Sequence, residues 1–415
     1  MILKNAKGTR DFLPIEKIVR DSITKQIKEV FELYGYSPLE TPALETFEVL
    51  SAKYAGGSEI LKETFKLKDQ GKRDLALRYD LTVPFARVIG MNPNIKMPFK
   101  RYQIDKVWRD GPIKLGRYRE FWQCDVDVVG CKEMIADAEL LSLSKEIFKK
   151  LELDIVIKVN NRKLMNGILD YCNVKEKDNV ILTIDKLDKI GNEEVRKELK
   201  KLKVKEIDKL MDILLLENGI LNELGKIEEA KEGLKEVNEL LEYCKAFNVD
   251  VKLDLSLARG LSYYTGTVFE IYLVDNKIKS SVAAGGRYDN MIGNFIGNGS
   301  YPAVGISFGL DVINDALALE GRNTIVKCYV IPIGKSLEAV KILNYLRENG
   351  IKTDIDINKR GISKNLDYAN SYKIPYVLFV GERELKEGKF KLRNMENGFE
   401  EMMTKEEVVK RLNNH

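Results

Sequence analysis

Apolar residues recur at helical spacing near the start of the chain. Five of them share one face of a helix over residues 17–34: Ile18, Ile23, Ile27, Val30 and Phe31. Gly35 follows, where a helix commonly ends because glycine adopts the left-handed conformation without strain. Pro38 and Pro42 then disfavour helix, so the pattern predicts an amphipathic helix followed by extended chain.

Strand-like segments occur at residues 75–79, 99–107, 119–129 and 268–274. No regular alternation of strands and helices connects them, so we expect antiparallel pairing. Residues 160–250 differ, because Lys, Glu and Leu dominate and the last part has helical spacing. This pattern predicts a mainly helical insertion whose charges are a solvated face; contact with nucleic acid is the less favoured interpretation.

A regular alternation appears after a change of composition at 319–325. It consists of a strand at 326–333, a helix at 335–348, a strand at 351–357, a helix at 363–372 and a strand at 375–380. Such alternation is typical of a small parallel α/β domain. The predicted fold class is therefore α+β with an antiparallel sheet over residues 1–320, interrupted by a helical insertion at 160–250 and followed by an α/β domain at 326–415.

The composition is that of a soluble globular protein, with 44% hydrophobic and 32% charged residues among 415. The net charge of +4 means that nucleic-acid contact would need local basic patches. We see no signal peptide and no stretch apolar enough to cross a bilayer. The five cysteines are scattered without a C-x-x-C pair, which favours reduced thiols in the cytoplasm over disulfides or a zinc site.

The histidine count restricts the chemistry further. The one histidine is His415, at the C-terminus. This excludes Ser-His-Asp and Cys-His hydrolases and argues against a metal site built from His or Cys. The nucleotide-binding glycine motifs are also missing, since "GKS" at 334–336 is preceded by Tyr329 where a phosphate-binding loop needs glycine. An ATP site here would need arginines and a sheet.

The stretch "VWRDGPIKLGRYREFWQCDVD" at 107–127 is the richest in chemistry. Phe121, Gln123, Asp125 and Asp127 share one face of the predicted strand 119–129. Unpaired carboxylates are not tolerated in an apolar core. The face is therefore either the solvated side of a hairpin or the wall of a binding site.

Three arginines in the same stretch favour the binding site. They are Arg109, Arg117 and Arg119, at the end of one strand and on the loop before the next. The planar fork of arginine binds phosphate and carboxylate groups with two parallel hydrogen bonds.

Two other motifs have an ordinary structural interpretation beside a functional one. In "LRYDLTVPFARV", Asp80 and Thr82 either belong to a functional site or are simply the N-cap of a helix, which we favour for this motif alone. In "AAGGRYDNMIG", Gly285 and Gly286 precede Arg287 and suit either a close backbone approach or a hairpin turn.

The motif "RGLSYYTGTVFE" at 259–270 has the same ambiguity. Tyr263 and Tyr264 are either core aromatics with satisfied hydroxyl groups or part of a pocket wall. Arg259 favours the pocket, because its charge stands within an apolar and aromatic stretch.

Together these segments resemble class II aminoacyl-tRNA synthetases, and specifically the histidyl-tRNA synthetase family. "KGTRDFLP" resembles the N-terminal signature, the segment from the first helix to Pro42 resembles motif 1, and residues 99–130 resemble motif 2. "ARGLSYYTGTVFE" and "AAGGRYDNM" resemble the two histidine-specific peptides, and "PAVGISFGLDVI" resembles motif 3. Residues 326–412 resemble the anticodon-binding domain, so the resemblance covers nearly the whole chain.

The resemblance implies the activity, the cofactors and the partners. Histidine and ATP, with Mg²⁺, would form histidyl-adenylate, and the histidyl group would pass to tRNA(His). Both reactants of the first step are anions, so positive charge must offset their repulsion. The family also implies a homodimer, built on motif 1, in the cytoplasm.

The resemblance also assigns roles to particular residues. Arg109 and Arg259 would act in catalysis, from opposite sides of the α-phosphate, and would also bind histidine. Asp80, Thr82 and Gln123 would hold the α-amino group, and Asp127, Tyr263 and Tyr264 the imidazole. Phe121 would lie against adenine, with Arg117 also binding ATP. Arg117 and Arg119 would contact the acceptor end of the tRNA.

Two positions depart from the family pattern. Motif 3 commonly has an arginine after its acidic residue, where this chain has Val312 after Asp311. Arg287 is a candidate replacement in ATP binding. Motif 2 commonly has an acidic residue two positions after its arginine, where this chain has Gly111.

These departures keep two alternatives open. One is the regulatory subunit of ATP phosphoribosyltransferase, which resembles the same catalytic domain and would sense histidine without catalysis. The other is a tRNA-binding sensor with an inactive site. The intact motif around Tyr263 and Tyr264 and the domain at 326–415 favour the synthetase.

Overall fold

The computed structural model describes residues 2–52, 59–113, 116–216, 219–258, 263–274, 278–296, 301–317 and 324–414. The chain divides into two compact units, one of residues 1–10 and 23–318 and one of residues 11–22 and 319–415. Helix α1 (Pro14–Leu33) is continuous across this division, and Gly35 follows it with a φ of +77°. The N-terminal helix and its glycine stop are therefore confirmed.

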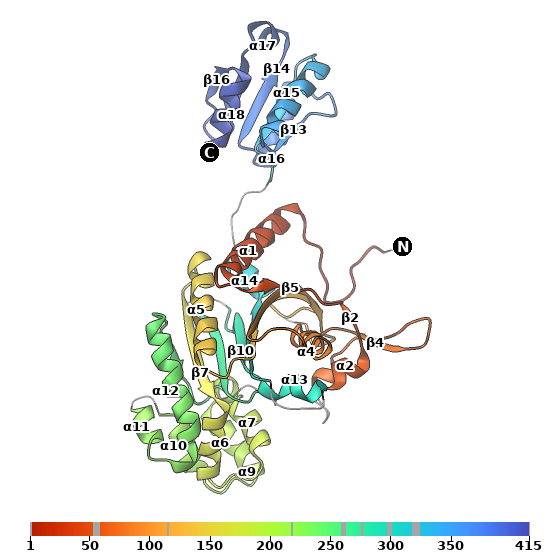
Figure 1. Cartoon of the computed structure of the whole chain (residues 1–415). Coiled ribbons are helices and arrows are strands. Elements are labelled where there is room, and N and C mark those ends of the chain that lie inside the picture. The colour runs from red at the N-terminus through yellow and green to blue at the C-terminus, as the bar shows by residue number, and fades with distance from the viewer. Residues whose placement is uncertain are drawn as a thin grey trace. The chain divides into compact units, whose positions relative to one another are not determined.

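An eight-stranded sheet forms the centre of the first unit (Figure 1). Its order is β1 (Ser37–Pro38), β5 (Phe99–Trp108), β6 (Glu120–Val129), β11 (Ala303–Gly309), β10 (Ala283–Arg287), β9 (Thr267–Leu273), β7 (Ile155–Asn161) and β8 (Lys252–Leu253). The six central strands pair antiparallel, as predicted, whereas the short end strands β1 and β8 pair parallel.

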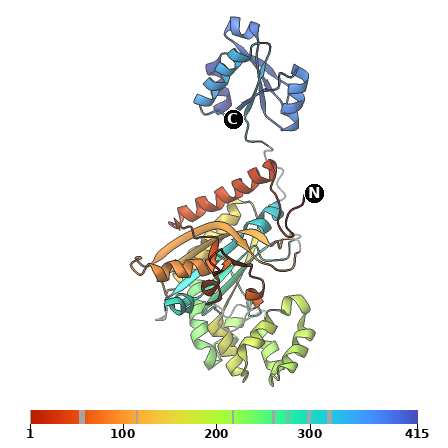
Figure 2. The same ribbon diagram turned by 90° about the vertical axis from the view of Figure 1, so that its right-hand side faces the viewer.

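The two faces of this sheet differ in polarity. On one face, Phe308 of β11 packs between Phe31 of α1 and Phe148 of α5 (Ile135–Lys150), at ring centroid distances of 5.9 and 6.0 Å. The aromatic rings fix α1 and α5 on that face, and Figure 2 shows α1 running along it. The polar residues that alternate with this core must then point to the opposite face.

Two helices and a small sheet flank the polar face. Helices α4 (Thr82–Met91) and α13 (Asp289–Ile296) pack together around Phe85 and Ile292. Strands β2 (Leu44–Thr46), β4 (Asp74–Leu77) and β3 (Lys66–Lys68) form the small antiparallel sheet. Helix α2 (Phe47–Ala52) packs on it, and α3 (Glu59–Lys62) precedes β3.

The segment between β7 and β8 is helical, as predicted. It contains α6 (Arg162–Tyr171), α7 (Lys177–Ile184), α8 (Leu187–Ile190), α9 (Asn192–Lys201), α10 (Ile207–Leu214), α11 (Ile220–Leu224), a 3₁₀ turn (Glu228–Ala230) and α12 (Lys231–Ala246). These helices share a buried apolar cluster of their own, and α12 also packs against α5 (Figure 1).

The second unit contains a five-stranded sheet. Its order is β13 (Thr353–Ile355), β12 (Cys328–Pro332), β14 (Tyr376–Val380), β15 (Phe390–Asn394) and β16 (Glu400–Met403). Helices α15 (Ser336–Glu348) and α18 (Lys405–Asn413) cover one face, α16 (Ile362–Ser371) covers the other, and α17 (Glu382–Glu387) follows β14 (Figure 2).

The predicted alternation accounts for the three parallel strands of this sheet. The antiparallel strands β15 and β16 were not predicted, because they are short and half-exposed and therefore carry a weak apolar pattern. Among the helices that the structure describes, none is long and apolar enough to span a membrane.

Candidate active site

A cavity of about 290 Å³ lies against the polar face of the large sheet. Strands β6, β10 and β11 form its floor, and residues 79–82 and 263–264 form its walls. Eight predicted site residues line it: Asp80, Thr82, Arg109, Phe121, Gln123, Asp127, Tyr263 and Tyr264. Segments that are far apart in the sequence therefore meet in one place of the size that small substrates need.

Every second residue of strand β6 from Phe121 to Asp127 faces this cavity. Phe121, Gln123, Asp125 and Asp127 all line it, so the interpretation as a solvated hairpin face is wrong. Gln123 Nε2 donates a 2.8 Å hydrogen bond to Ser307 Oγ on the neighbouring strand β11. The order along the strand runs from an aromatic ring through an amide to two carboxylates.

Asp127 has two strong partners below the cavity floor. Its Oδ2 lies 2.7 Å from Nη2 of Arg101, whose side chain is fully buried and stacks 4.3 Å from the ring centroid of Phe85. Its Oδ1 accepts a hydrogen bond from the hydroxyl of Tyr288. Burial and the adjacent Asp127 raise the pKa of Tyr288 well above its usual value, so the phenol stays a donor.

Glycine makes room for the Asp127 carboxylate. A Cβ atom on Gly305 of β11 would lie 1.9 Å from Asp127 Oδ1, and a Cβ atom on Gly286 of β10 would lie 2.8 Å from the ring of Tyr264. Gly286 and Gly285 lie within strand β10 and not in a hairpin turn. The interpretation as a close backbone approach is thus the correct one.

Asp125 is a second carboxylate on the cavity floor, and the sequence assigned it no role. It is 3% exposed, and burial raises its pKa from 3.8 to about 7. Arg101 and a hydrogen bond from Ser307 lower this pKa, whereas Asp127 and Asp80 raise it further. The cavity therefore holds several acidic groups close together in an environment that disfavours their charge.

The Asp80 segment serves the helix and the cavity at once. Asp80 Oδ1 accepts a 3.0 Å hydrogen bond from the backbone N–H of Val83, in the first turn of α4. The predicted capping role is thus confirmed for one oxygen, while the carboxylate also lines the cavity. The two interpretations of this motif are compatible.

The two tyrosines form one wall. Their ring centroids are 4.5 Å apart, their hydroxyl oxygens are 3.4 Å apart, and Tyr264 is 6% exposed. The phenol groups of Tyr263 and Tyr264 therefore reach the same part of the cavity.

Arg109 brings positive charge to the cavity. Its Nε donates a 3.0 Å hydrogen bond to the carbonyl oxygen of Tyr79, and its guanidinium lies 5.1 Å from the ring centroid of Phe121. Within the described part of the chain the guanidinium makes no ion pair, so an anionic ligand meets no competing carboxylate there.

The other two arginines of the predicted cluster do not line the cavity. Arg117 lies 3.2 Å from Glu63 and is about half exposed, and Arg119 lies 2.9 Å from Asp110. Beside them, a Cβ atom on Gly111 would lie 2.9 Å from the carboxyl carbon of Glu63. A carboxylate from a distant segment therefore stands next to the position where motif 2 lacks its own.

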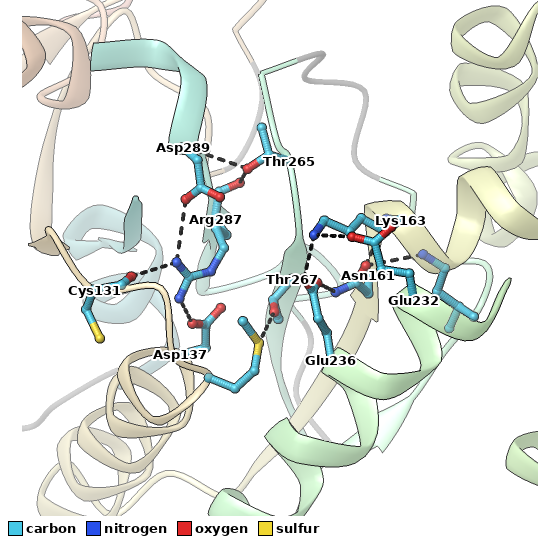
Figure 3. Close-up of polar contacts among 12 residues, drawn as sticks. Cys131, Asp137, Asn161, Lys163, Glu232, Glu236, Thr265, Thr267, Arg287 and Asp289 are labelled. Atoms are coloured by element: carbon cyan, nitrogen blue, oxygen red, sulfur yellow. Dashed lines mark hydrogen bonds and ion pairs between the residues drawn. The ribbon is translucent and has the colours of Figure 1, made fainter. Parts of the chain in front are cut away.

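Arg287 is held inside the protein, contrary to the prediction that it binds ATP. Its side chain is 3% exposed and pairs with Asp137 of α5, while Nη1 donates a 2.8 Å hydrogen bond to the carbonyl oxygen of Cys131 (Figure 3). Asp289 lies 3.5 Å away. A guanidinium with these partners is not available to ATP, and Arg287 does not line the cavity.

The remaining predicted positions are Arg259 and Val312. Arg259 lies outside the described residues. Val312 lines the cavity, and the acid before it, Asp311, accepts 2.8 and 2.9 Å hydrogen bonds from Arg10 Nη2 and the backbone N–H of Trp122. Asp311 thus ties the N-terminal segment to the strand that carries Phe121.

Sequence reasoning missed four residues of the site: Arg101, Asp125, Tyr288 and Ser307. The shared face of β6 was a sufficient signal for Asp125. The others could not be found from the sequence, because their partners lie on other strands and depend on register.

No group of three or more His, Cys, Asp or Glu side chains in the described ranges is placed to hold a metal ion. The acidic side chains of the cavity suit a ligand with a positively charged group, and Arg109 suits a negatively charged group on the same ligand.

Residues 327–415 match the anticodon binding domain model. Together with this unit, the antiparallel sheet and its charged cavity define a class II aminoacyl-tRNA synthetase. Residues 8–313 match the family model described as histidyl-tRNA synthetase. The chain belongs to the histidyl-tRNA synthetase family.

Individual relatives agree with this assignment. A histidine--tRNA ligase 1 of Bacillus cereus (strain ZK / E33L) is 47% identical over 413 residues, which cover 96% of this chain and 97% of the relative. The crystal structure of histidyl-tRNA synthetase from Nostoc sp. PCC 7120 has a TM-score of 0.89 at 29% identity, and the match covers 100% of this chain and 99% of that chain.

A third match has two names in its description. It is an "ATP phosphoribosyltransferase regulatory subunit/histidyl-tRNA synthetase" from Bacillus halodurans C, with a TM-score of 0.78 and 26% identity over 92% of this chain and 99% of that chain. Its description does not separate the synthetase from the regulatory alternative, whereas the relative at 47% identity is named as a ligase.

Proposed function

We propose that this protein ligates L-histidine to tRNA(His) through a histidyl-adenylate. The observation that carries the proposal is the cavity, where acidic and phenolic groups at one end and an arginine beside an aromatic ring at the other line one site. Histidine is a cation at its amino end and an anion at its carboxyl end, which matches this polarity.

In the first step, a carboxylate oxygen of histidine attacks the α-phosphorus of ATP. The new P–O bond forms as the bond to the β-phosphate oxygen breaks, and pyrophosphate leaves with the electron pair. Arg109 offsets the repulsion between the carboxylate and the phosphate and stabilises the charge that develops on the phosphoryl oxygens. Phe121 stacks on the adenine and Arg117 contacts the nucleotide, while Arg259 acts from the other side of the phosphate.

Histidine is held by its two polar ends. Asp80, Thr82 and Gln123 accept hydrogen bonds from the α-ammonium group, and Asp127, Tyr263 and Tyr264 contact the imidazole. Because Arg101 and Tyr288 already fix the Asp127 carboxylate, it meets the ring in one orientation. A ligand without polar groups on its ring could not make these hydrogen bonds, which gives selectivity for histidine.

In the second step, a ribose hydroxyl at the tRNA terminus attacks the carbonyl carbon of the adenylate, and AMP leaves. Arg117 and Arg119 lie on the loop between β5 and β6, outside the cavity, where they are accessible to the phosphates of an acceptor end. The unit at 326–415 binds the anticodon.

ATP would enter as its Mg²⁺ complex. Mg²⁺ prefers oxygen ligands and is commonly held by substrate phosphates with few protein groups, so it would offset part of the phosphate charge during the first step.

The proposal extends to assembly and location. We propose a homodimer built on residues 17–42, in the cytoplasm, with a catalytic domain at 1–320, an insertion at 160–250 and an anticodon-binding domain at 326–415. Light scattering at micromolar concentration tests the dimer.

The experiment that tests the function is ATP–pyrophosphate exchange with each of the twenty amino acids, followed by aminoacylation of tRNA(His). Exchange with histidine alone and charging of the tRNA support the proposal. A folded protein that binds histidine but catalyses neither reaction would be a sensor and would overturn it.

A further inference from the structure

Two buried acceptors on the cavity floor lack a hydrogen-bond donor within the described part of the chain. They are Asp125 Oδ1 and Gln123 Oε1. Both side chains line the cavity, two residues apart on the same face of β6. A buried acceptor without a donor costs about 1–3 kcal/mol, so a ligand that supplies donors here gains that free energy.

Ser307 connects the two side chains. It pairs with Asp125 across β11 and β6, and its Oγ accepts a 2.8 Å hydrogen bond from Gln123 Nε2. Its hydroxyl group also lowers the pKa of the Asp125 carboxyl group, as a donor that favours the charged form does. Ser307 thus holds the amide of Gln123 so that Oε1 is left for a ligand, and it stabilises the carboxylate of Asp125 beside it.

The charges around Asp125 favour a cationic ligand. Asp80 and Asp127 face it as like charges, and the cation that faces it, Arg101, lies 2.7 Å from Asp127. Asp125 itself makes no ion pair with any residue that the structure describes. An ammonium group offers three donors and a full positive charge, whereas a neutral imidazole offers one donor.

We propose that Asp125 is a histidine-binding residue whose Oδ1, together with Gln123 Oε1, accepts hydrogen bonds from the α-ammonium group of L-histidine, and that Ser307 is the positioning residue for both. This inference rests on the proposed function. It adds a buried carboxylate to the acceptors expected from the family, and it places the ammonium group between Gln123 and Asp125.

The test measures ligand affinity by calorimetry at pH 8 for the whole protein. The ligands are L-histidine, histidinol, which keeps the ammonium group and lacks the carboxylate, and imidazolepropionate, which lacks the ammonium group. Asp125→Asn should weaken histidine and histidinol by about tenfold to a hundredfold, the range for a hydrogen bond to a charged group. The affinities for imidazolepropionate and ATP should not fall.

Two further variants sharpen the result. Ser307→Ala should weaken histidine and histidinol and spare imidazolepropionate, a selectivity that a general loss of structure would not produce. Glu120→Gln is the matched control, because it removes a carboxylate from the same strand outside the cavity and should change no affinity.

Two outcomes would overturn the inference. One is a histidine affinity of Asp125→Asn within twofold of the unmodified protein. The other is an equal loss for imidazolepropionate, which would assign Asp125 to the ring or to the fold. Binding is measured without turnover, so the two proposals can fail separately. A protein that binds histidine and catalyses no exchange would refute the proposed function, while the effect of Asp125→Asn on histidine binding could still be measured and interpreted.

Discussion

Asp125→Asn should change how the stability of the catalytic unit depends on pH. Asp125 is 3% exposed on the cavity floor, and burial raises its pKa from 3.8 to about 7. The folded protein therefore keeps a proton on this carboxyl group at pH values where the unfolded chain has released it. Asparagine has nearly the same shape and no ionisable group, so the substitution removes this difference in proton binding.

The sign follows from which state holds the proton. Between about pH 4 and pH 7 the folded state binds more protons than the unfolded state, so the contribution of Asp125 to the free energy of unfolding falls as pH rises. The rise in pKa from 3.8 to about 7 is a change of about three powers of ten in the acid constant, and each power of ten corresponds to about 1.4 kcal/mol. Above pH 7, the ionisable group of Asp125 therefore lowers the free energy of unfolding by about 4 kcal/mol. Below pH 4 both states are protonated, and the contribution is close to zero.

The assay is urea unfolding between pH 4 and pH 8, followed by tryptophan fluorescence. The chain has two tryptophans, Trp108 and Trp122, and both lie in the large sheet, so the signal reports the catalytic unit. The free energy of unfolding of Asp125→Asn should exceed that of the unmodified protein by about 4 kcal/mol at pH 8 and should be almost equal to it at pH 4.

Asp74→Asn, at a side chain that is 68% exposed, controls for the loss of one negative charge. A difference between Asp125→Asn and the unmodified protein that is constant from pH 4 to pH 8 would refute the reasoning.

Three further predictions follow from the site. Arg109→Ala should lower the rate of ATP–pyrophosphate exchange by about a hundredfold or more with an unchanged unfolding midpoint, and a loss below tenfold would contradict its role. Gly305→Ala places a Cβ atom 1.9 Å from Asp127 Oδ1, so it should raise the KM for histidine and lower the free energy of unfolding by about 1–3 kcal/mol. Gly361→Ala is the control, because its Cβ atom would meet nothing within 4 Å and should change neither quantity in this way. Arg287→Ala leaves Asp137 buried without its partner and should cost about 3–5 kcal/mol in urea unfolding, with the KM for ATP unaltered in enzyme that remains folded.

The apolar pattern of the sequence was sufficient to predict single helices and strands, whose residues are neighbours in the chain. The helix that ends before Gly35, the long strands β5, β6 and β9, and the three parallel strands of the C-terminal unit follow from apolar periodicity. Strand alternation also placed Phe121, Gln123, Asp125 and Asp127 on one face. Periodicity is sufficient here because each element has to bury one face, and residues within it repeat at a fixed spacing.

Arg287 illustrates where the sequence pattern was insufficient. Its charge, directly after Gly285 and Gly286, suggested a ligand, yet the fold brings Asp137 of α5 and the carbonyl oxygen of Cys131 to its guanidinium. A lone arginine in a sequence does not reveal whether its partner is a ligand or a residue 150 positions away. That choice depends on how strands and helices pack.

The sequence by itself determined the first helix, the longer strands, the helical insertion, the two-part organisation and most of the side chains that could carry chemistry. Only the tertiary structure decided which of those side chains meet, because strand register and helix packing bring Ser307 to Asp125, Arg101 to Asp127 and Glu63 to Gly111. Periodicity describes what one segment buries, whereas hydrogen bonds and ion pairs depend on distances of a few ångströms between segments that are remote in the chain.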